Sequence, residues 1–145
     1  MKKHLLRIVL LLMFGVCAFK FYDIHWLRHR YLITAYCDCP ICINRVGFRD
    51  GKFANMQSVH WGGMAADKSV PFGASVELLP VTVKDLLAVD TYLGKRRHFT
   101  VEDRGSKIRG KRLDIYFPQS RGGHEAALHW GARRMRVRIN GKLAD

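Results

Sequence analysis

Alternation of hydrophobic and polar positions is clearest near the end of the chain, where residues 135–139 read Met-Arg-Val-Arg-Ile. A period of two is typical of a β-strand with one face in a core and one face in water. Other segments rich in β-branched and aromatic residues are also predicted to be strands. They are 31–36, 74–79 and the two short runs at the ends of 100–117.

Two segments have helical features instead. Within 82–92, Val83, Leu86 and Leu87 lie close to helical spacing, although a hairpin excursion is an alternative for this segment. Residues 124–131 are predicted to form a short helix that Gly131 ends. Short strands, one or two short helices and glycine-rich turns favour a small β-barrel over a sandwich. The segment 43–64, punctuated by four glycines, is expected to be loop.

Composition places the chain among globular proteins of one domain. It has 145 residues, of which 48% are hydrophobic and 26% are charged, with a formal net charge of +13. The basic residues are scattered along the sequence rather than gathered in one block or on one helical face. Without a basic helix or an aromatic stacking platform, we expect no nucleic-acid partner.

The first 22 residues have the features of an export signal or a membrane anchor. A basic start that includes Lys2 and Lys3 precedes an almost unbroken apolar run from Ile8 to Phe19. That length is close to the hydrophobic region of a signal peptide and short for a spanning helix. A core helix of a cytosolic domain is a less favoured alternative. We therefore expect residues 1–22 to be a signal peptide or anchor and 23–30 a linker. The rest is expected to lie outside the cytoplasm, in the periplasm or cell envelope.

Three cysteines follow the strand predicted at 31–36. Cys37, Cys39 and Cys42 could supply three ligands to a zinc ion, but the spacing is unusual and no nearby fourth ligand is evident. In an oxidising compartment two of them could form a disulfide. The third interpretation is reduced thiols that line a turn. Zinc is the least favoured of these three interpretations, and no metal site is predicted.

The segment 100–117 contains the main candidate residues for a functional site. Asp103 closes its first apolar run, Asp114 lies inside its second, and a basic loop connects the two. A carboxylate flanked by apolar strand residues is costly unless it is paired or functional. The choice is between an ordinary hairpin with ion-paired aspartates and a site.

Several short motifs follow one another along the chain. They are Thr34-Ala-Tyr36, Ala65-Ala-Asp67 with Val70-Pro-Phe-Gly73, Val101-Glu-Asp103-Arg-Gly105, Arg112-Leu-Asp114-Ile-Tyr-Phe117 and His124-Glu-Ala-Ala-Leu-His-Trp-Gly131. Taken in this order, they resemble the 3D domain family, named for three aspartates, which occurs in stationary-phase muralytic proteins and in membrane-bound lytic transglycosylase A. The resemblance covers about residues 31–139 and implies that 31–140 form a six-stranded double-psi β-barrel with a glycan-binding groove.

The resemblance also implies an activity. Family members cut the β-1,4 bond between N-acetylmuramic acid and N-acetylglucosamine in peptidoglycan, with no cofactor, and leave a 1,6-anhydromuramoyl product. By position, Asp114 matches the catalytic acid/base and Asp103 a supporting carboxylate. Asp67, Thr34 and Tyr36 match residues that contact the glycan. Peptidoglycan glycan strands are therefore the expected partner.

One motif departs from the family pattern. The loop after Asp103 commonly reads Thr-Gly-Gly-Ala, whereas here it reads Arg104-Gly-Ser-Lys107. A side chain in place of glycine can narrow a groove that a substrate must approach closely. A noncatalytic glycan-binding barrel is therefore the alternative function.

Overall fold

The computed structural model describes residues 13–15, 17, 29–42 and 51–144. The chain divides into two units, Met1–Arg30 with Asp145, and Tyr31–Ala144. In the first unit, residues 13–15 and 17 are helical. Among the described residues, no helix has the length and apolar character needed to span a membrane. Most of the predicted signal peptide or anchor and of the linker falls outside the described residues.

The second unit is mostly β-structure with a few short helices, as the sequence predicts. Its α-helices are α2 (Val83–Leu93) and α3 (Gly123–Trp130), and a 3-10 turn, η1, spans Gln119–Arg121. The strands are β1 (Tyr31–Tyr36), β2 (Gly63–Ala66), β3 (Ser75–Leu79), β4 (His98–Asp103), β5 (Arg112–Tyr116), β6 (Arg133–Ile139) and β7 (Lys142–Leu143).

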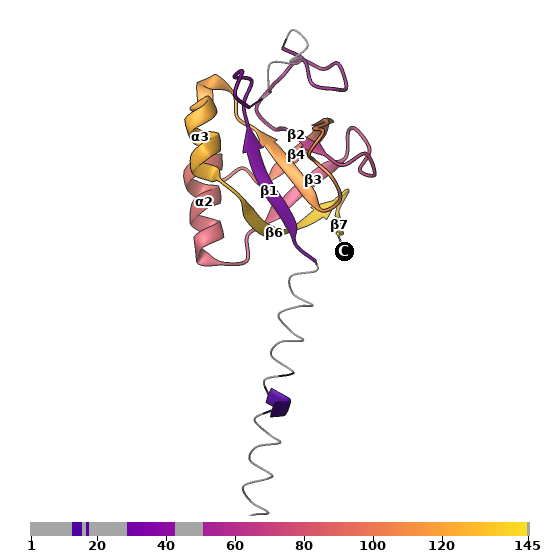
Figure 1. Cartoon of the computed structure of the whole chain (residues 1–145), viewed down its shortest axis with the longest axis vertical. Coiled ribbons are helices and arrows are strands. Elements are labelled where there is room, and N and C mark those ends of the chain that lie inside the picture. Colours follow the sequence, from indigo (N-terminus) through magenta and orange to yellow (C-terminus); the bar gives the residue numbers. More distant parts are fainter. Residues whose placement is uncertain (1–12, 16, 18–28, 43–50, 145) are drawn as a thin grey trace, which may run out of the picture. The chain divides into compact units, whose positions relative to one another are not determined.

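Six of the strands close into a barrel. They lie in the order β1-β5-β2-β4-β3-β6, β6 pairs back to β1, and β7 extends the sheet from β6 (Figure 1). The pairs β1–β5 and β2–β4 are parallel, and the other pairs are antiparallel. This order excludes the hairpin alternative for 100–117, because β2 lies between β4 and β5 and pairs with both.

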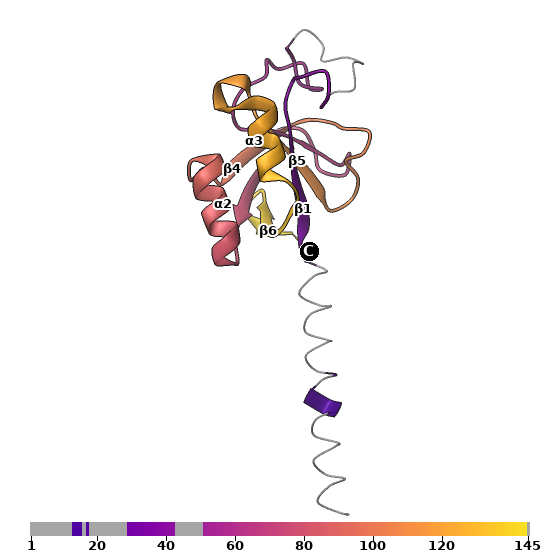
Figure 2. The same ribbon diagram turned by 60° about the vertical axis from the view of Figure 1, so that its left-hand side comes forward.

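The barrel interior is a continuous apolar core. Alternate residues of the six barrel strands contribute to this core. The helices α2 and α3 lie side by side on one flank of the barrel (Figures 1 and 2). The Trp130 indole N–H at the end of α3 donates to the carbonyl of Ile33 in β1 over 3.2 Å, so the helix is attached to the barrel wall. Side chains that are fully buried there include Ile33, Met64, Leu78, Leu113, Ile115, Phe117, Trp130 and Met135.

The predicted helices are confirmed, and one strand of the barrel was missed, as was the short β7. The Thr82 hydroxyl accepts from the Asp85 N–H at the start of α2, and Gly94 ends the helix in the left-handed conformation, which excludes the hairpin alternative. The missed strand is β2, whose sequence Gly-Met-Ala-Ala has little β propensity. Close packing selects such small residues: a Cβ on Gly63 would lie 2.3 Å from Phe53 Cζ.

Candidate functional site

Four residues from four neighbouring strands lie in one row across the sheet. Thr34 of β1 is in register with Asp114 of β5, and Asp114 is in register with Ala65 of β2. Ala65 is in turn in register with Asp103 of β4. Because neighbouring strands are about 4.8 Å apart, the two aspartates lie two strand spacings from each other, with only a methyl group between them. We call Thr34, Asp114, Ala65 and Asp103 the carboxylate row.

A bulge brings Asp103 into this row. Met64 pairs with Val101, but the next residue, Ala65, pairs with Asp103, so Glu102 is an extra residue in β4. In a regular strand Asp103 would point to the same side as Val101, which is fully buried in the barrel. The bulge instead turns Asp103 to the outer surface. There it meets Tyr36.

Asp114 is a half-buried carboxyl group. The Thr34 hydroxyl donates to its Oδ1 over 2.7 Å, and Arg112 Nη2 lies 3.5 Å from Thr34 Oγ1. Burial raises the pKa of Asp114 to about 6, against the opposing effects of the Thr34 hydrogen bond and the Arg112 charge. The negative charge of Asp103 acts in the same direction as burial. Near neutral pH both forms of this carboxyl group are therefore populated.

Asp103 has a different environment, because donors occupy both of its oxygens. The Tyr36 hydroxyl donates to Oδ2 over 2.6 Å, and the Ala54 backbone N–H donates to Oδ1 over 3.0 Å. Burial, followed by the charge of Asp103, raises the pKa of Tyr36 well above its usual value. The phenol therefore stays protonated and keeps donating. Asp103 is thus held by two donors beside a titrating Asp114.

A small apolar cluster on the outside of the barrel accounts for the burial beside the row. Phe53 packs edge-on against Tyr116 at a ring separation of 5.4 Å, and Tyr116 lies 5.6 Å from the ring of Tyr36. The cluster consists of Tyr36, Phe53, Ala65, Ile108 and Tyr116. Tyr116 shares a strand face with Asp114, so the cluster borders that carboxyl group and removes water from it.

Asp67 is placed differently from the other two aspartates. It follows β2 directly, and its carboxylate accepts from the backbone N–H groups of Ser69 over 2.9 Å and Gly110 over 3.1 Å. These bonds lower the pKa of Asp67. The aspartate thus joins the turn after β2 to the loop between β4 and β5. It is not part of the carboxylate row, and its predicted contact with glycan remains a prediction.

Two arginines of the basic loop between β4 and β5 donate to backbone carbonyl groups. Arg104 donates to the carbonyls of Val70 over 2.7 Å and Ala66 over 3.3 Å, and its guanidinium stacks 4.0 Å from the ring of Phe72. Arg109 bonds to carbonyls of its own loop. These guanidinium groups therefore serve the local backbone, and the cation whose charge opposes the raised pKa of Asp114 is Arg112, the first residue of β5.

A surface depression of about 440 Å³ lies elsewhere on the domain. It is basic, and none of its lining residues belongs to the carboxylate row. The lining residues are Trp61, Leu93, Gly94, Lys95, Arg96, Arg97, His98 and Arg121.

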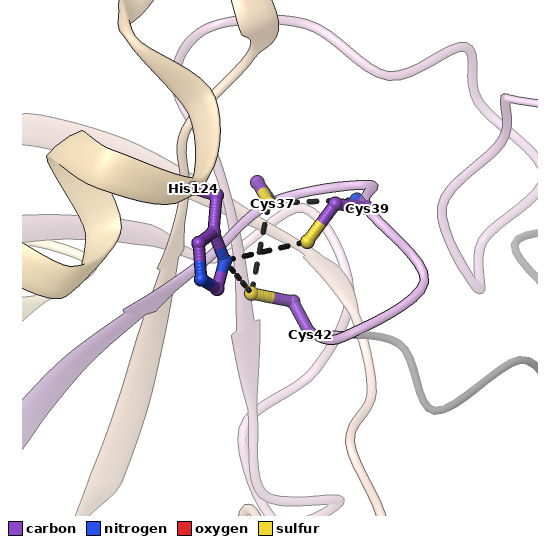
Figure 3. Close-up of side chains that lie close together, drawn as sticks. All are labelled: Cys37, Cys39, Cys42 and His124. Carbon is purple, nitrogen blue, oxygen red and sulfur yellow. Dashed lines mark hydrogen bonds between the residues drawn. The ribbon is translucent and has the colours of Figure 1, made fainter.

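The three clustered cysteines meet a histidine that the sequence interpretation overlooked. Cys37, Cys39 and Cys42, in the loop after β1, converge on His124 in the first turn of α3 (Figure 3). Their donor atoms all lie within 4.8 Å of one another. The three thiols are free. His124 was visible only as a polar residue at the start of a predicted helix, more than 80 positions from the cysteines, so nothing local connected them.

Comparison with known proteins identifies the domain. The family model of the 3D domain matches residues 63–140, more than half of the chain. The chain belongs to the 3D domain family. The match includes all three predicted aspartates, Asp67, Asp103 and Asp114. Thr34 and Tyr36 precede the matched segment, and it is the barrel that brings them to the carboxylates.

Solved structures similar to this 3D domain protein include several of the lytic transglycosylase MltA from E. coli. A crystal structure of MltA is 23% identical with a TM-score of 0.41, covering 64% of this chain and 28% of that one. MltA with bound chitohexaose is 22% identical with a TM-score of 0.42, covering 61% of this chain and 26% of that one. The chain thus spans little more than a quarter of MltA. No curated protein matches it.

Proposed function

We propose that this 3D domain protein is a lytic transglycosylase that cuts peptidoglycan between N-acetylmuramic acid and N-acetylglucosamine. The observation that carries the proposal is the pair of unlike carboxyl groups in the carboxylate row. Asp114 has a pKa of about 6, and Asp103 is held by two donors on the other side of Ala65. A carboxyl group that can both hold and release a proton near neutral pH suits general acid/base catalysis.

In the proposed reaction Asp114 performs both proton transfers. It first protonates the glycosidic oxygen as the bond from that oxygen to muramoyl C1 breaks. The resulting carboxylate then takes the proton of the muramoyl C6 hydroxyl while O6 bonds to C1. The product is a 1,6-anhydro sugar, Asp114 regains its proton, and no water is consumed. This scheme needs one titrating carboxyl group, unlike the pair that most glycosidases require.

The other residues of the site have supporting roles in this proposal. Asp103 positions the sugar and stabilises positive charge at C1. Thr34 and Tyr36 keep the two carboxyl groups in place and line the glycan path, which Asp67 borders. The two parallel strand pairs fit a barrel of the double-psi type. We further propose export to the cell envelope, where the substrate lies, with the N-terminal segment as signal or anchor.

The product decides between this enzyme and a glycan-binding barrel. The full chain is incubated with purified peptidoglycan, and the soluble fraction is searched for anhydromuropeptides by mass spectrometry. We expect them from the wild type, a loss of at least about 100-fold in Asp114→Asn, and no change in Asp90→Asn on α2. A chain that co-sediments with peptidoglycan and releases none would refute the enzymatic proposal.

The pH profile tests the assignment of Asp114 separately. The free enzyme must carry the proton on Asp114, so kcat/KM should fall as the pH rises through about 6. If the activity rose across this pH range, Asp114 could not be the acid.

Glycan binding can be measured separately, with chitohexaose as a soluble probe.

A further inference from the structure

We propose that Cys37, Cys39, Cys42 and His124 bind one zinc ion in a closed structural site. The four side chains point toward a common centre between the loop after β1 and the start of α3 (Figure 3). Thiolate sulfur and imidazole nitrogen are the donors that tetrahedral zinc prefers. Three sulfurs and one nitrogen make up a recognised structural donor set.

The distances between donors agree with such a tetrahedron. With bonds of about 2.3 Å to sulfur and about 2.0–2.1 Å to nitrogen, a tetrahedral ion holds two sulfurs about 3.8 Å apart. The same geometry holds a sulfur and a nitrogen about 3.6 Å apart. In the structure Cys37 Sγ and Cys42 Sγ are separated by 3.6 Å. His124 Nδ1 lies 3.4 Å from the Sγ atoms of both Cys39 and Cys42. Three of the six donor distances are thus close to those of a zinc tetrahedron, and all six are within 4.8 Å.

The loop itself is built to present these sulfurs. The Cys42 N–H donates to the Cys39 carbonyl over 3.1 Å and closes a tight turn. The Cys39 N–H points at Cys37 Sγ from 3.4 Å. A backbone donor at a ligating sulfur is the kind of outer contact that fixes the orientation of a metal ligand. His124 is brought in by α3, whose Trp130 is bonded to β1. Local spacing and tertiary packing thus converge on one point.

The donor count makes the site structural rather than catalytic. Four protein ligands complete a tetrahedron and leave no position for water, whereas catalytic zinc sites keep one open. A hydrolase mechanism through these cysteines is therefore disfavoured. The ion would instead clamp the end of β1, the strand that carries Thr34 and Tyr36, to α3. It would stabilise the partners of both carboxylates from outside the carboxylate row.

Metal content is the first test. The full chain is purified under reducing conditions, and its zinc and iron contents are measured by elemental mass spectrometry. We expect one zinc per chain, a loss of most of it in Cys39→Ser and His124→Ala, and full retention in Cys17→Ser and His129→Ala. The last two are matched controls, because Cys17 and His129 lie outside the cluster. Stoichiometric iron in place of zinc would overturn the choice of metal.

Substitution with Co²⁺ tests the coordination geometry of the site. The chelated, reduced chain is titrated with Co²⁺ and should develop sulfur-to-cobalt charge transfer and strong visible bands of a tetrahedral ion, which Zn²⁺ then removes. Thermal unfolding of the wild type tests metal binding even where a variant fails to fold. Its Tm should rise by an amount on the order of 10 °C with excess zinc relative to chelator, and Mg²⁺ should have no effect.

Two results would overturn the proposal. One is a folded, fully reduced chain, with all four cysteines of the sequence titrating as thiols in denaturant, that gives no cobalt spectrum. The other is a cobalt spectrum unchanged in His124→Ala and Cys39→Ser. If the chain forms a Cys37–Cys42 disulfide and still takes up no metal after reduction, these residues are a redox pair instead.

Discussion

Replacing Asp114 with asparagine tests the origin of its raised pKa without any substrate. The substitution is nearly isosteric, and the side-chain oxygen can still accept from the Thr34 hydroxyl. What it removes is the titrating proton and the charge that appears when that proton leaves. Stability measured against pH therefore isolates the cost of burying this charge.

The sign follows from the two pKa values. In the unfolded chain the carboxyl group has its ordinary pKa of 3.8, and in the folded protein it is about 6. Well below pH 3.8 both states hold the proton and Asp114 costs nothing. Between pH 4 and 6 only the folded state keeps it, so rising pH favours unfolding. Above pH 6 the cost reaches its full value.

The magnitude can be worked from the shift of about two units. At 1.36 kcal/mol per unit, the upper limit is about 3 kcal/mol, and the partial exposure of Asp114 lowers the expectation to about 1–2 kcal/mol. For a domain of this size, such a gain in Asp114→Asn corresponds to a Tm increase of roughly 4–8 °C above pH 6.

The assay is thermal unfolding of the wild type and the variant between pH 4 and 8, followed by circular dichroism. The Tm difference should be smallest at pH 4, grow through pH 5–6 and then level off. Asp67→Asn is a control of opposite sign, because backbone hydrogen bonds lower the pKa of Asp67. Its stabilising effect is present above pH 4 and lost at lower pH, so that variant should be less stable at neutral pH. A Tm difference for Asp114→Asn that does not depend on pH would refute the explanation by burial.

Three further substitutions test the packing around the site. Tyr36→Phe leaves one oxygen of Asp103 without its hydroxyl donor and should cost about 1–3 kcal/mol in urea unfolding, while Tyr92→Phe should cost little. An unchanged midpoint for Tyr36→Phe would mean that water replaces the phenol. Gly63→Ala places a methyl group against the Phe53 ring and should cost about 1–3 kcal/mol, measured in the same way; a neutral result would show that the ring moves aside freely. Trp130→Phe removes the indole donor between α3 and β1 and should cost about 1–3 kcal/mol. A loss of Tm below 1 °C would argue against that bond as an anchor.

Much of the secondary structure could be predicted because its cause is local. The strict alternation in 135–139 and the β-branched and aromatic content of 31–36 arise from one buried face, and both segments are strands, β6 and β1. β2 was missed because its four small residues carry no such pattern and are selected by the ring of Phe53, a contact between separate segments.

The candidate site divides in the same way. Asp103 and Asp114 stand out in the sequence because a carboxylate among apolar strand residues needs a reason. The sequence does not reveal their distinct environments, because these depend on the hydroxyl groups of Thr34 and Tyr36. Both hydroxyl groups come from β1, about 70 to 80 positions away along the chain. The same limit applies to His124, which no spacing rule connects to the cysteines.

The linear pattern of residues established that this protein is mostly β-structure, where most strands lie and which aspartates deserve testing. Side-chain periodicity and the desolvation cost of a charge act over a few residues, so they can be read without a fold. Strand order, the bulge at Glu102 and the meeting of three thiols with an imidazole came only from the tertiary structure. Packing between segments that are distant in sequence determines which strands pair, so a local pattern of residues cannot predict the pairing.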